Sequence, residues 1–169
     1  QSLLAFMLAF AVGQLVYGPL SDMFGRKPPL YAGIGIFLAG TVGAALAPSI
    51  EWLVFFRFVQ GMGACAPMSL PRAIVRDNYT GAPAAQLMSL IMLVFSVSPI
   101  LAPLSGSFVI QFGDWRTLFY VMAATGVLGL LLVACVLKET RPKAARTGST
   151  LASAVGSYWH LLRDLKCMG

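Results

Sequence analysis

The charged residues of this 169-residue sequence are few, and most lie at the ends of long apolar runs. Asp22, Arg26 and Lys27 follow the first run, and Asp77 follows the third. Arg57 differs, because it lies inside the third run. An enzyme acting inside a membrane would need paired aspartates, a histidine cluster or a serine next to a base. The apolar runs contain none of these, so the sequence predicts that the protein is not an enzyme.

Histidine and cysteine residues do not form a ligand pattern in this sequence. His160 is the single histidine, Cys65 and Cys135 lie inside apolar runs, and Cys167 lies near the last residue. No pair has the spacing of a zinc site or of a disulfide framework. We therefore expect neither a metal ion nor another cofactor.

Five apolar runs, each long enough to cross a lipid bilayer, position the charged residues. Hydrophobic residues make up 58% of the chain and charged residues 11%, with a mean hydropathy of +0.80. A soluble domain has about 25% charged residues, so this chain cannot be covered by water on all sides. Runs such as Leu87–Phe95 lack the alternating polarity of barrel strands. The expected fold is an all-α membrane protein, a polytopic transmembrane helix bundle, with spans at about 1–20, 29–48, 51–73, 83–111 and 117–138.

Basic residues are concentrated in the connections on one side of the predicted bundle. Ten of the twelve Lys and Arg residues lie after the first, third and fifth runs. Because cytoplasmic connections carry such an excess, we expect residue 1 on the periplasmic side and the C-terminal tail on the cytoplasmic side. The net charge of +6 then reports orientation, and no nucleic-acid partner is expected.

Residues 143–169 differ from the preceding runs, because a basic stretch leads into a segment with apolar residues at helical spacing. We predict that they form a cytoplasmic linker. The spacing from Leu151 to Leu165 fits an amphipathic helix on the membrane surface. It fits the approach to a further span equally well, so both alternatives stay open.

The connection between the first two runs reads GPLSDMFGRKPPL from Gly18 to Leu30. It resembles the signature loop between the second and third helices of the major facilitator superfamily. An ordinary basic turn would need neither the two spaced glycines nor Asp22 four residues before Arg26. We expect a tight loop over residues 21–28. The motif is matched at Gly18, Leu20, Asp22, Gly25, Arg26 and Lys27.

The resemblance implies that this loop latches one conformation of a transporter through a network of charges. Gly18 is expected to allow the close approach of a neighbouring helix, and Gly25 to take a positive φ. Asp22 is expected to face the positive N-terminal end of a helix in the partner half of the transporter. Arg26 is predicted to pair with Asp77, which would join the loop to the end of the third span. The candidate gating residues are Gly18, Asp22, Gly25, Arg26, Lys27 and Asp77.

The third run reads RFVQGMG from Arg57 to Gly63 and resembles the fourth-helix motif of the same family. A charge inside a span is disfavoured by about 2.5–3.5 kcal/mol, so it normally faces a cavity or a partner. Alternatively, Arg57 snorkels to the headgroups, since it lies only about 9 Å inside the outer boundary. The resemblance implies a role in proton coupling for Arg57, Gln60 and Gly61. Their acidic partner would come from another helix, such as a missing first one.

The fourth run contains SVSPILAPLSG, which resembles in degraded form the fifth-helix antiporter motif of the family, G-x-x-x-G-P-x-x-G-G. Pro103 and Gly106 match, whereas Ala102 replaces a glycine. Ser98, Ala102 and Gly106 lie four residues apart and predict a small-residue face for close helix packing. Pro99 and Pro103 remove backbone donors and predict a bent helix.

Residues 1–142 resemble the bicyclomycin/chloramphenicol-resistance branch (Bcr/CflA) of the drug:proton antiporters in this family. The resemblance rests on RFVQGMGACA, PRAIVRD and the fourth-run motif followed by Trp115-Arg116. It implies that the five runs are family helices two to six, and that the first helix and the C-terminal half are missing from a partial chain. The whole protein would exchange drugs or small amphiphilic molecules for protons across the bacterial inner membrane. The partial chain is expected to be inactive alone.

A transporter of a specific metabolite with the same architecture is the alternative. A membrane scaffold without transport is a further one, although it would need neither Arg57 nor the loop motif. The expected partners are the lipid bilayer, a drug-like substrate and the rest of the transporter, and the resemblance implies a proton gradient as the driving force. Adaptable side chains favour varied apolar drugs, although core packing uses the same residue types. In this sequence these side chains are Met62, Met68, Met88, Met92 and Phe95.

Overall fold

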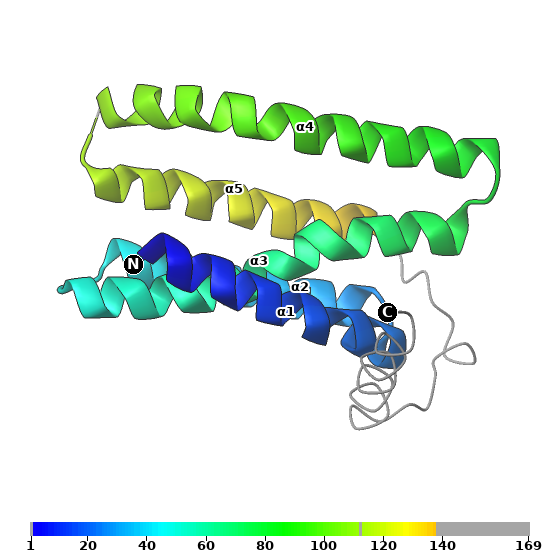
Figure 1. Cartoon of the computed structure of the whole chain (residues 1–169), viewed down its shortest axis with the longest axis horizontal. Coiled ribbons are helices and arrows are strands. Elements are labelled where there is room, and N and C mark those ends of the chain that lie inside the picture. The colour runs from blue at the N-terminus through cyan, green and yellow to red at the C-terminus, as the bar shows by residue number, and fades with distance from the viewer. Residues whose placement is uncertain (1, 112, 138–169) are drawn as a thin grey trace, which may run out of the picture.

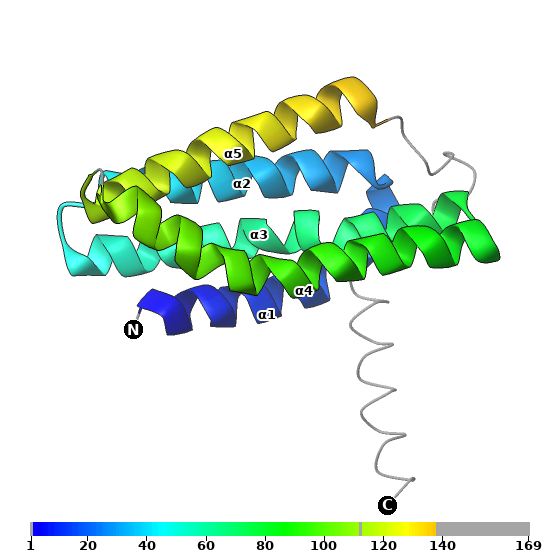
Figure 2. The same ribbon diagram turned by 90° about the horizontal axis from the view of Figure 1, so that it is seen from above.

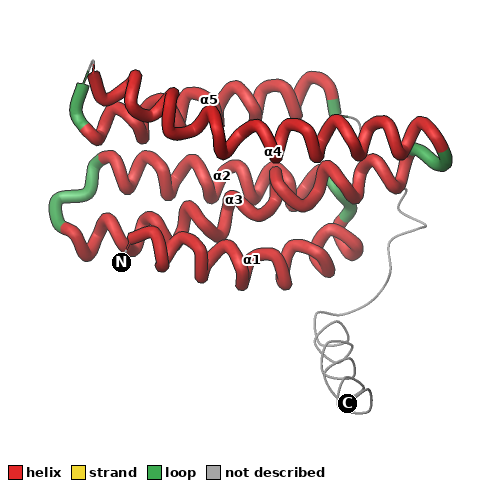
Figure 3. Tube along the Cα trace, turned by 45° about the horizontal axis from the view of Figure 1, so that its top comes forward, coloured by secondary structure: helices red, strands yellow, loops and turns green. Residues whose placement is uncertain are grey.

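The computed structural model describes residues 2–111 and 113–137. These residues form no β-strand, and each of their helices is long and apolar enough to cross a membrane. The helices run side by side along the long axis of the molecule (Figure 1 and Figure 3). The all-α bundle predicted from the sequence is confirmed, while the membrane boundaries of the spans stay a prediction. The helices are α1 (Ser2–Phe24), α2 (Lys27–Ala45), α3 (Ile50–Asn78), α4 (Ala82–Gln111) and α5 (Trp115–Val136).

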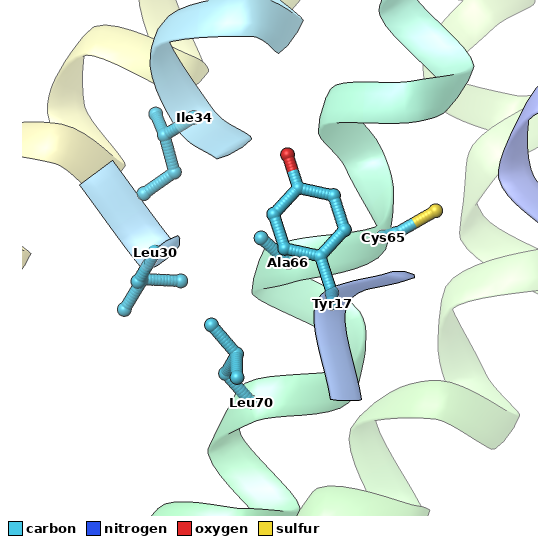
Figure 4. Packing of buried hydrophobic residues seen from close by; sticks show 6 residues of the cluster. All are labelled: Tyr17, Leu30, Ile34, Cys65, Ala66 and Leu70. Carbon is cyan, nitrogen blue, oxygen red and sulfur yellow. The ribbon is translucent and has the colours of Figure 1, made fainter. Parts of the chain in front are cut away.

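Helix α3 forms the centre of the packed part of the bundle. It packs against both α1 and α2, and α5 packs mainly against α2. Figure 2 shows α2 between α3 and α5. Where α1, α2 and α3 meet, a hydrophobic cluster forms around the Tyr17 ring (Figure 4). Its buried members are Tyr17, Leu30, Ile34, Cys65, Ala66 and Leu70.

Glycines permit the close approach of α2 to α3. A Cβ at Gly33 would clash with the Ala66 side chain, and a Cβ at Gly63 would clash with the Phe37 backbone. Small residues at helix crossings let backbones pack closely inside a membrane, where the hydrophobic effect does not drive helices together. These two glycines therefore set the spacing of the central helix pair.

Helix α4 lies apart from this core. None of the described residues of α4 is buried, and its sparse contacts are with α3 and α5. The helix continues through Pro99 and Pro103 and curves along its length (Figure 2). Prolines that remove intrahelical hydrogen bonds allow such curvature.

The first helix is longer than the sequence predicted. We expected a loop over residues 21–28, but α1 continues through Pro19 to Phe24 and α2 begins at Lys27. The helix ends at Phe24, and Gly25 directly after it has a φ of 95°, which agrees with the positive φ expected there. The short connection places the last turn of α1 beside the start of α2.

Two further segments of the chain need comment. Helix α3 extends to Asn78, beyond the end of the third span that was expected near residue 73. Residues 143–169, predicted as a cytoplasmic linker with an amphipathic helix, lie outside the described residues.

Candidate functional site

Three polar residues surround Arg26 at the end of the bundle where α1 and α3 end and α2 begins. Arg26 Nε donates a hydrogen bond to Asp77 Oδ2 at 2.7 Å, and Nη2 donates to Oδ1 at 3.4 Å. Arg26 Nη1 lies 3.1 Å from Asp22 Oδ1 and donates a hydrogen bond to Ser21 Oγ. We refer to Ser21, Asp22, Arg26 and Asp77 as the Arg26 cluster.

The pairing of Arg26 with Asp77, predicted from the sequence, is present. The two residues are 51 positions apart, so the pair joins the α1–α2 connection to the end of α3. The Arg26 side chain is 8% exposed and that of Asp77 27%, so water screens the pair only partly. Two nitrogens of one guanidinium on one carboxylate fix orientation as well as distance.

Ser21 belongs to the Arg26 cluster, although the sequence did not single it out. The residue is 1% exposed. Its Oγ donates a hydrogen bond to the Gly18 carbonyl oxygen at 2.8 Å and accepts one from Arg26. The available signal was its position three residues after Gly18, since serine hydroxyls in helices often bond back to a preceding carbonyl.

Gly18 does not have the close neighbour that was expected. A Cβ added at Gly18 would meet nothing within 4 Å among the residues that the structure describes. The reason is that Gly18 is exposed, whereas Gly13 and Tyr17 carry the buried face of α1. The predicted close approach is therefore not made by α2, α3, α4 or α5. Lys27, the first residue of α2, places its Nζ 5.6 Å from the ring centroid of Tyr31.

Arg57 forms a second cluster near the opposite end of α3. Its guanidinium carbon lies 5.7 Å from the ring centroid of Phe6 on α1 and 5.1 Å from that of Phe119 on α5. Arg57 Nη1 donates a hydrogen bond to Gln60 Oε1 at 3.0 Å. The half-buried side chain therefore lies between α1, α3 and α5. No carboxylate in the described part of the chain forms an ion pair with Arg57.

Gln60 extends this cluster to α2. Gln60 Nε2 donates a hydrogen bond to Thr41 Oγ1 at 2.8 Å, and Thr41 Oγ1 donates to the Phe37 carbonyl oxygen at 2.6 Å. Gln60 and Thr41 are both 0% exposed. Buried polar side chains need partners because the dielectric is low, and this chain of bonds supplies them. We refer to Phe6, Thr41, Arg57, Gln60 and Phe119 as the Arg57 cluster.

The sequence did not single out Thr41. Its signal was weak, because a threonine in an apolar run often bonds only to the carbonyl four residues before it. The bond from Thr41 to Phe37 is of that kind. Only the packing of α2 against α3 adds Gln60 as the second partner of Thr41.

Glycines on both sides of Gln60 hold it against its neighbours. A Cβ at Gly40 would lie 2.5 Å from the Gln60 backbone nitrogen. A Cβ at Gly61 would clash with the Phe6 carbonyl oxygen. Both α1 and α2 therefore approach α3 closely around Gln60. In the structure, the contribution of Gly61 to the Arg57 cluster is this close packing.

The residues of the predicted antiporter-type motif on α4 join neither cluster. A Cβ at Gly106 would meet nothing within 4 Å among the described residues. Ser98 Oγ donates a hydrogen bond within its own helix, to the Val94 carbonyl oxygen at 2.7 Å. The packing seam expected on this face is therefore not made within the described part of the chain, because α4 has only sparse contacts with α3 and α5. All five residues of the motif are exposed or half-buried: Ser98, Pro99, Ala102, Pro103 and Gly106.

The two clusters can hold helices in one arrangement. The Arg26 cluster ties α3 to the α1–α2 connection, and the Arg57 cluster ties α3 to α1, α2 and α5. Rearrangements in proteins proceed by opening and reforming such ion pairs and hydrogen bonds. Within the described ranges, no group of three or more His, Cys, Asp or Glu residues is placed to bind a metal ion.

Comparison with known proteins agrees with this architecture. The family described as Major Facilitator Superfamily matches residues 2–166. The crystal structure of the human organic anion transporter MFSD10 (TETRAN) is similar with a TM-score of 0.72 at 26% sequence identity. That similarity covers 88% of this chain and 33% of the human chain.

Several bacterial proteins are similar over most of this chain. It is 40% identical to the uncharacterized MFS-type transporter YdgK of Bacillus subtilis and 36% identical to the bicyclomycin resistance protein homolog of Haemophilus influenzae. Each comparison covers 99% of this chain and 42% of the relative. The multidrug resistance protein MdtM of Salmonella typhimurium is 33% identical, over 90% of this chain and 35% of that protein. The chain thus spans less than half the length of these relatives.

Proposed function

Because this chain belongs to the Major Facilitator Superfamily of membrane transporters, we propose that it is part of a proton-coupled exporter of drugs or small amphiphilic molecules. The family predicted from the loop motif is confirmed, and it is a family of transporters and not of enzymes. The chain spans 42% of the length of two relatives, so export is proposed for a whole transporter. We place that transporter in a bacterial inner membrane, with residue 1 on the periplasmic side.

The Arg57 cluster is the observation that carries proton coupling. The Arg57 guanidinium, between two aromatic rings and a buried glutamine, is a permanent positive charge inside the bundle. A carboxyl group next to such a charge loses its proton more readily, and it regains the proton when the charge moves away. A change in the position of Arg57 would thereby drive proton release and uptake. The carboxyl group would come from a helix outside the described residues.

The Arg26 cluster supports conformational gating at the proposed cytoplasmic side. Arg26, in the α1–α2 connection, pairs with Asp22 in the last turn of α1 and with Asp77 in the last turn of α3. Alternating access in such transporters requires contacts that hold one conformation and open in the other. Arg26 pairing with Asp77 and Asp22 would supply such a contact.

The drug-like substrate class has two supports. Relatives are named for bicyclomycin resistance and for multidrug resistance. Within this chain, a groove between α3 and α4 is lined by apolar side chains, including Phe95. An apolar lining is better suited to varied apolar substrates than to one defined polar metabolite. Transport of a specific metabolite is the alternative.

Transport by the full-length protein in proteoliposomes tests the proposal. An imposed proton gradient should drive movement of a lipophilic antibiotic, and addition of the antibiotic should move protons, read by a trapped pH-sensitive dye. Arg57→Gln should reduce coupled transport by about tenfold or more, and Arg57→Lys should retain part of it because it keeps the charge. Arg76→Gln removes an exposed charge from the same helix and should leave transport unchanged.

The possible outcomes separate the alternatives. Antibiotic movement without proton movement would contradict coupling but keep export. Equal transport by the native protein and the Arg57→Gln variant would remove Arg57 from the mechanism. Absence of transport for lipophilic antibiotics, with transport of one polar metabolite, would establish the alternative substrate class.

A further inference from the structure

A groove of about 270 Å³ lies between α3 and α4, on the side of α3 that carries two prolines. Small-molecule sites in proteins have volumes of about 300–1,000 Å³, so this groove is suited to a short apolar group. Its described lining contains no charged side chain. The lining residues are Pro67, Pro71, Leu90, Ile91, Val94 and Phe95.

Arg72 places a positive charge next to one lining residue of this groove. Its guanidinium carbon lies 5.1 Å from the ring centroid of Phe95, which is itself a lining residue. Arg72 Nε is buried and has no hydrogen-bond partner among the described residues. No carboxylate in the same ranges forms an ion pair with Arg72. This arginine differs from Arg26, whose guanidinium is bonded to Ser21 and Asp77.

The Arg72 side chain reaches the Phe95 ring, which lines the groove. Side chains of a helix are directed toward its N-terminus. Arg72 lies near the C-terminal end of α3, while its contact Phe95 lies well inside α4. The charge is therefore carried toward the apolar lining. A buried polar nitrogen without a partner is unfavourable, more so when the group is charged, and an anionic oxygen would satisfy it.

We propose that the groove between α3 and α4 binds a small amphiphilic anion. Its carboxylate or phosphate accepts hydrogen bonds from the Arg72 guanidinium, and its apolar part lies against Pro67, Leu90 and Val94. Phe95 contributes to both parts of the site, because its ring supports the guanidinium by a cation–π contact and lines the groove. This proposal rests on the proposed export function only where it names the substrate class, because binding to the groove needs no proton gradient.

Binding of radiolabelled octanoic acid, a short-chain amphiphilic anion, to the purified full-length protein tests the site. The protein is placed in nanodiscs of zwitterionic phosphatidylcholine, and the methyl ester of the same probe serves as the uncharged comparison. The acid should bind about tenfold tighter than the ester, as expected for one charge-assisted contact. Arg72→Gln should abolish this difference, and Arg72→Lys should restore part of it. Arg76→Gln, the matched loss of an exposed charge in the same helix, should leave it intact.

A second variant separates groove binding from general surface charge. Leu90→Trp fills the groove at an exposed position, so it should weaken acid and ester alike. Monodisperse elution of each variant shows that it is folded. Equal binding of acid and ester by the native protein would overturn the proposal, as would equal effects of Arg72→Gln and Arg76→Gln.

Lipid composition distinguishes the source of the anion. In nanodiscs that contain phosphatidylglycerol, a small-molecule site should keep its preference for the acid. Loss of acid binding in those nanodiscs alone would assign Arg72 to a lipid headgroup and overturn the small-molecule site. Failure of any of these binding tests leaves proton-coupled transport untouched, because no gradient is present. Failure of coupled transport would in turn leave the binding result standing.

Discussion

Arg26 and Asp77 join two segments of the chain that lie 51 positions apart, through a hydrogen bond of 2.7 Å from Nε to Oδ2. Arg26 stands in the connection that follows α1, and Asp77 in the last turn of α3. The nearby Asp22 and Ser21 contact the third nitrogen of the same guanidinium, Nη1. Because several partners converge on one side chain, changes at this site should not be additive, and paired variants are informative.

Charge reversal tests whether the Arg26–Asp77 pair is a latch. Asp77→Arg should impair transport and lower the free energy of unfolding, because it faces two guanidinium groups toward each other. Adding Arg26→Asp should restore part of both, with a coupling energy of about 0.5–3 kcal/mol. Rescue should be incomplete, since the new aspartate would lie beside Asp22. The measurement is a double-mutant cycle of detergent-induced unfolding together with transport.

The reversal has a control in the same turn of α3. Arg76 is exposed, so Arg76→Asp should change stability by less than about 0.5 kcal/mol. A double variant that is no better than Asp77→Arg alone would count against the latch.

Ser21→Ala should destabilise the end of α1. The change removes the acceptor for Arg26 Nη1 and the bond to the Gly18 carbonyl, with a loss of about 0.5–1.5 kcal/mol per bond. Ser89→Ala is a matched control, because Ser89 is exposed and its Oγ makes the same kind of bond to the Gln86 carbonyl oxygen at 2.8 Å. Unfolding free energies of the two variants should differ by about 1 kcal/mol or more. Equal values would show that Ser21 is not a working part of the cluster.

Thr41→Val should weaken the Arg57 cluster without changing the size of the side chain. Gln60 Nε2 would lose its acceptor while remaining buried, with a penalty of about 1–3 kcal/mol. Thr125→Val makes the same chemical change on α5, where Thr125 is exposed and donates to the Met122 carbonyl oxygen of its own helix. Thermal unfolding in detergent should therefore show a large shift for the first variant and almost none for the second. A comparable shift in both would mean that the bond to Gln60 adds nothing to stability.

Gly33→Ala should disturb the packing of α2 on α3. The added methyl would clash with Ala66, and overpacking of a core costs about 1–3 kcal/mol. Gly35→Ala lies two residues further on the same helix, where a Cβ meets nothing within 4 Å among the described residues. That variant should gain about 0.5–1 kcal/mol, because alanine favours a helix. Opposite signs in unfolding experiments are expected, and two gains would contradict the close approach at Gly33.

The sequence by itself determined the membrane class, the number of long apolar helices in the described ranges and the family. These follow from local properties: apolar runs as long as a bilayer is thick, and motif residues close together in the chain. The pairing of Arg26 with Asp77 was also predicted, because both residues follow apolar runs that end on the same predicted side of the membrane. The end of α1 was misplaced, because a loop was expected over residues 21–28 and the helix continues to Phe24.

Only the tertiary structure decided the other contacts between polar groups. It turned Arg57 toward Phe6 and Phe119, and it added Thr41 and Ser21 to the two clusters. It also left Gly18 and Gly106 without close neighbours in the described part of the chain. The physical reason is that nearly every face of these helices is apolar, so hydrophobic pattern does not tell a packed face from a lipid-facing one. Which face packs is set by glycines at the crossings and by buried hydrogen bonds, and these depend on residues far apart in the sequence.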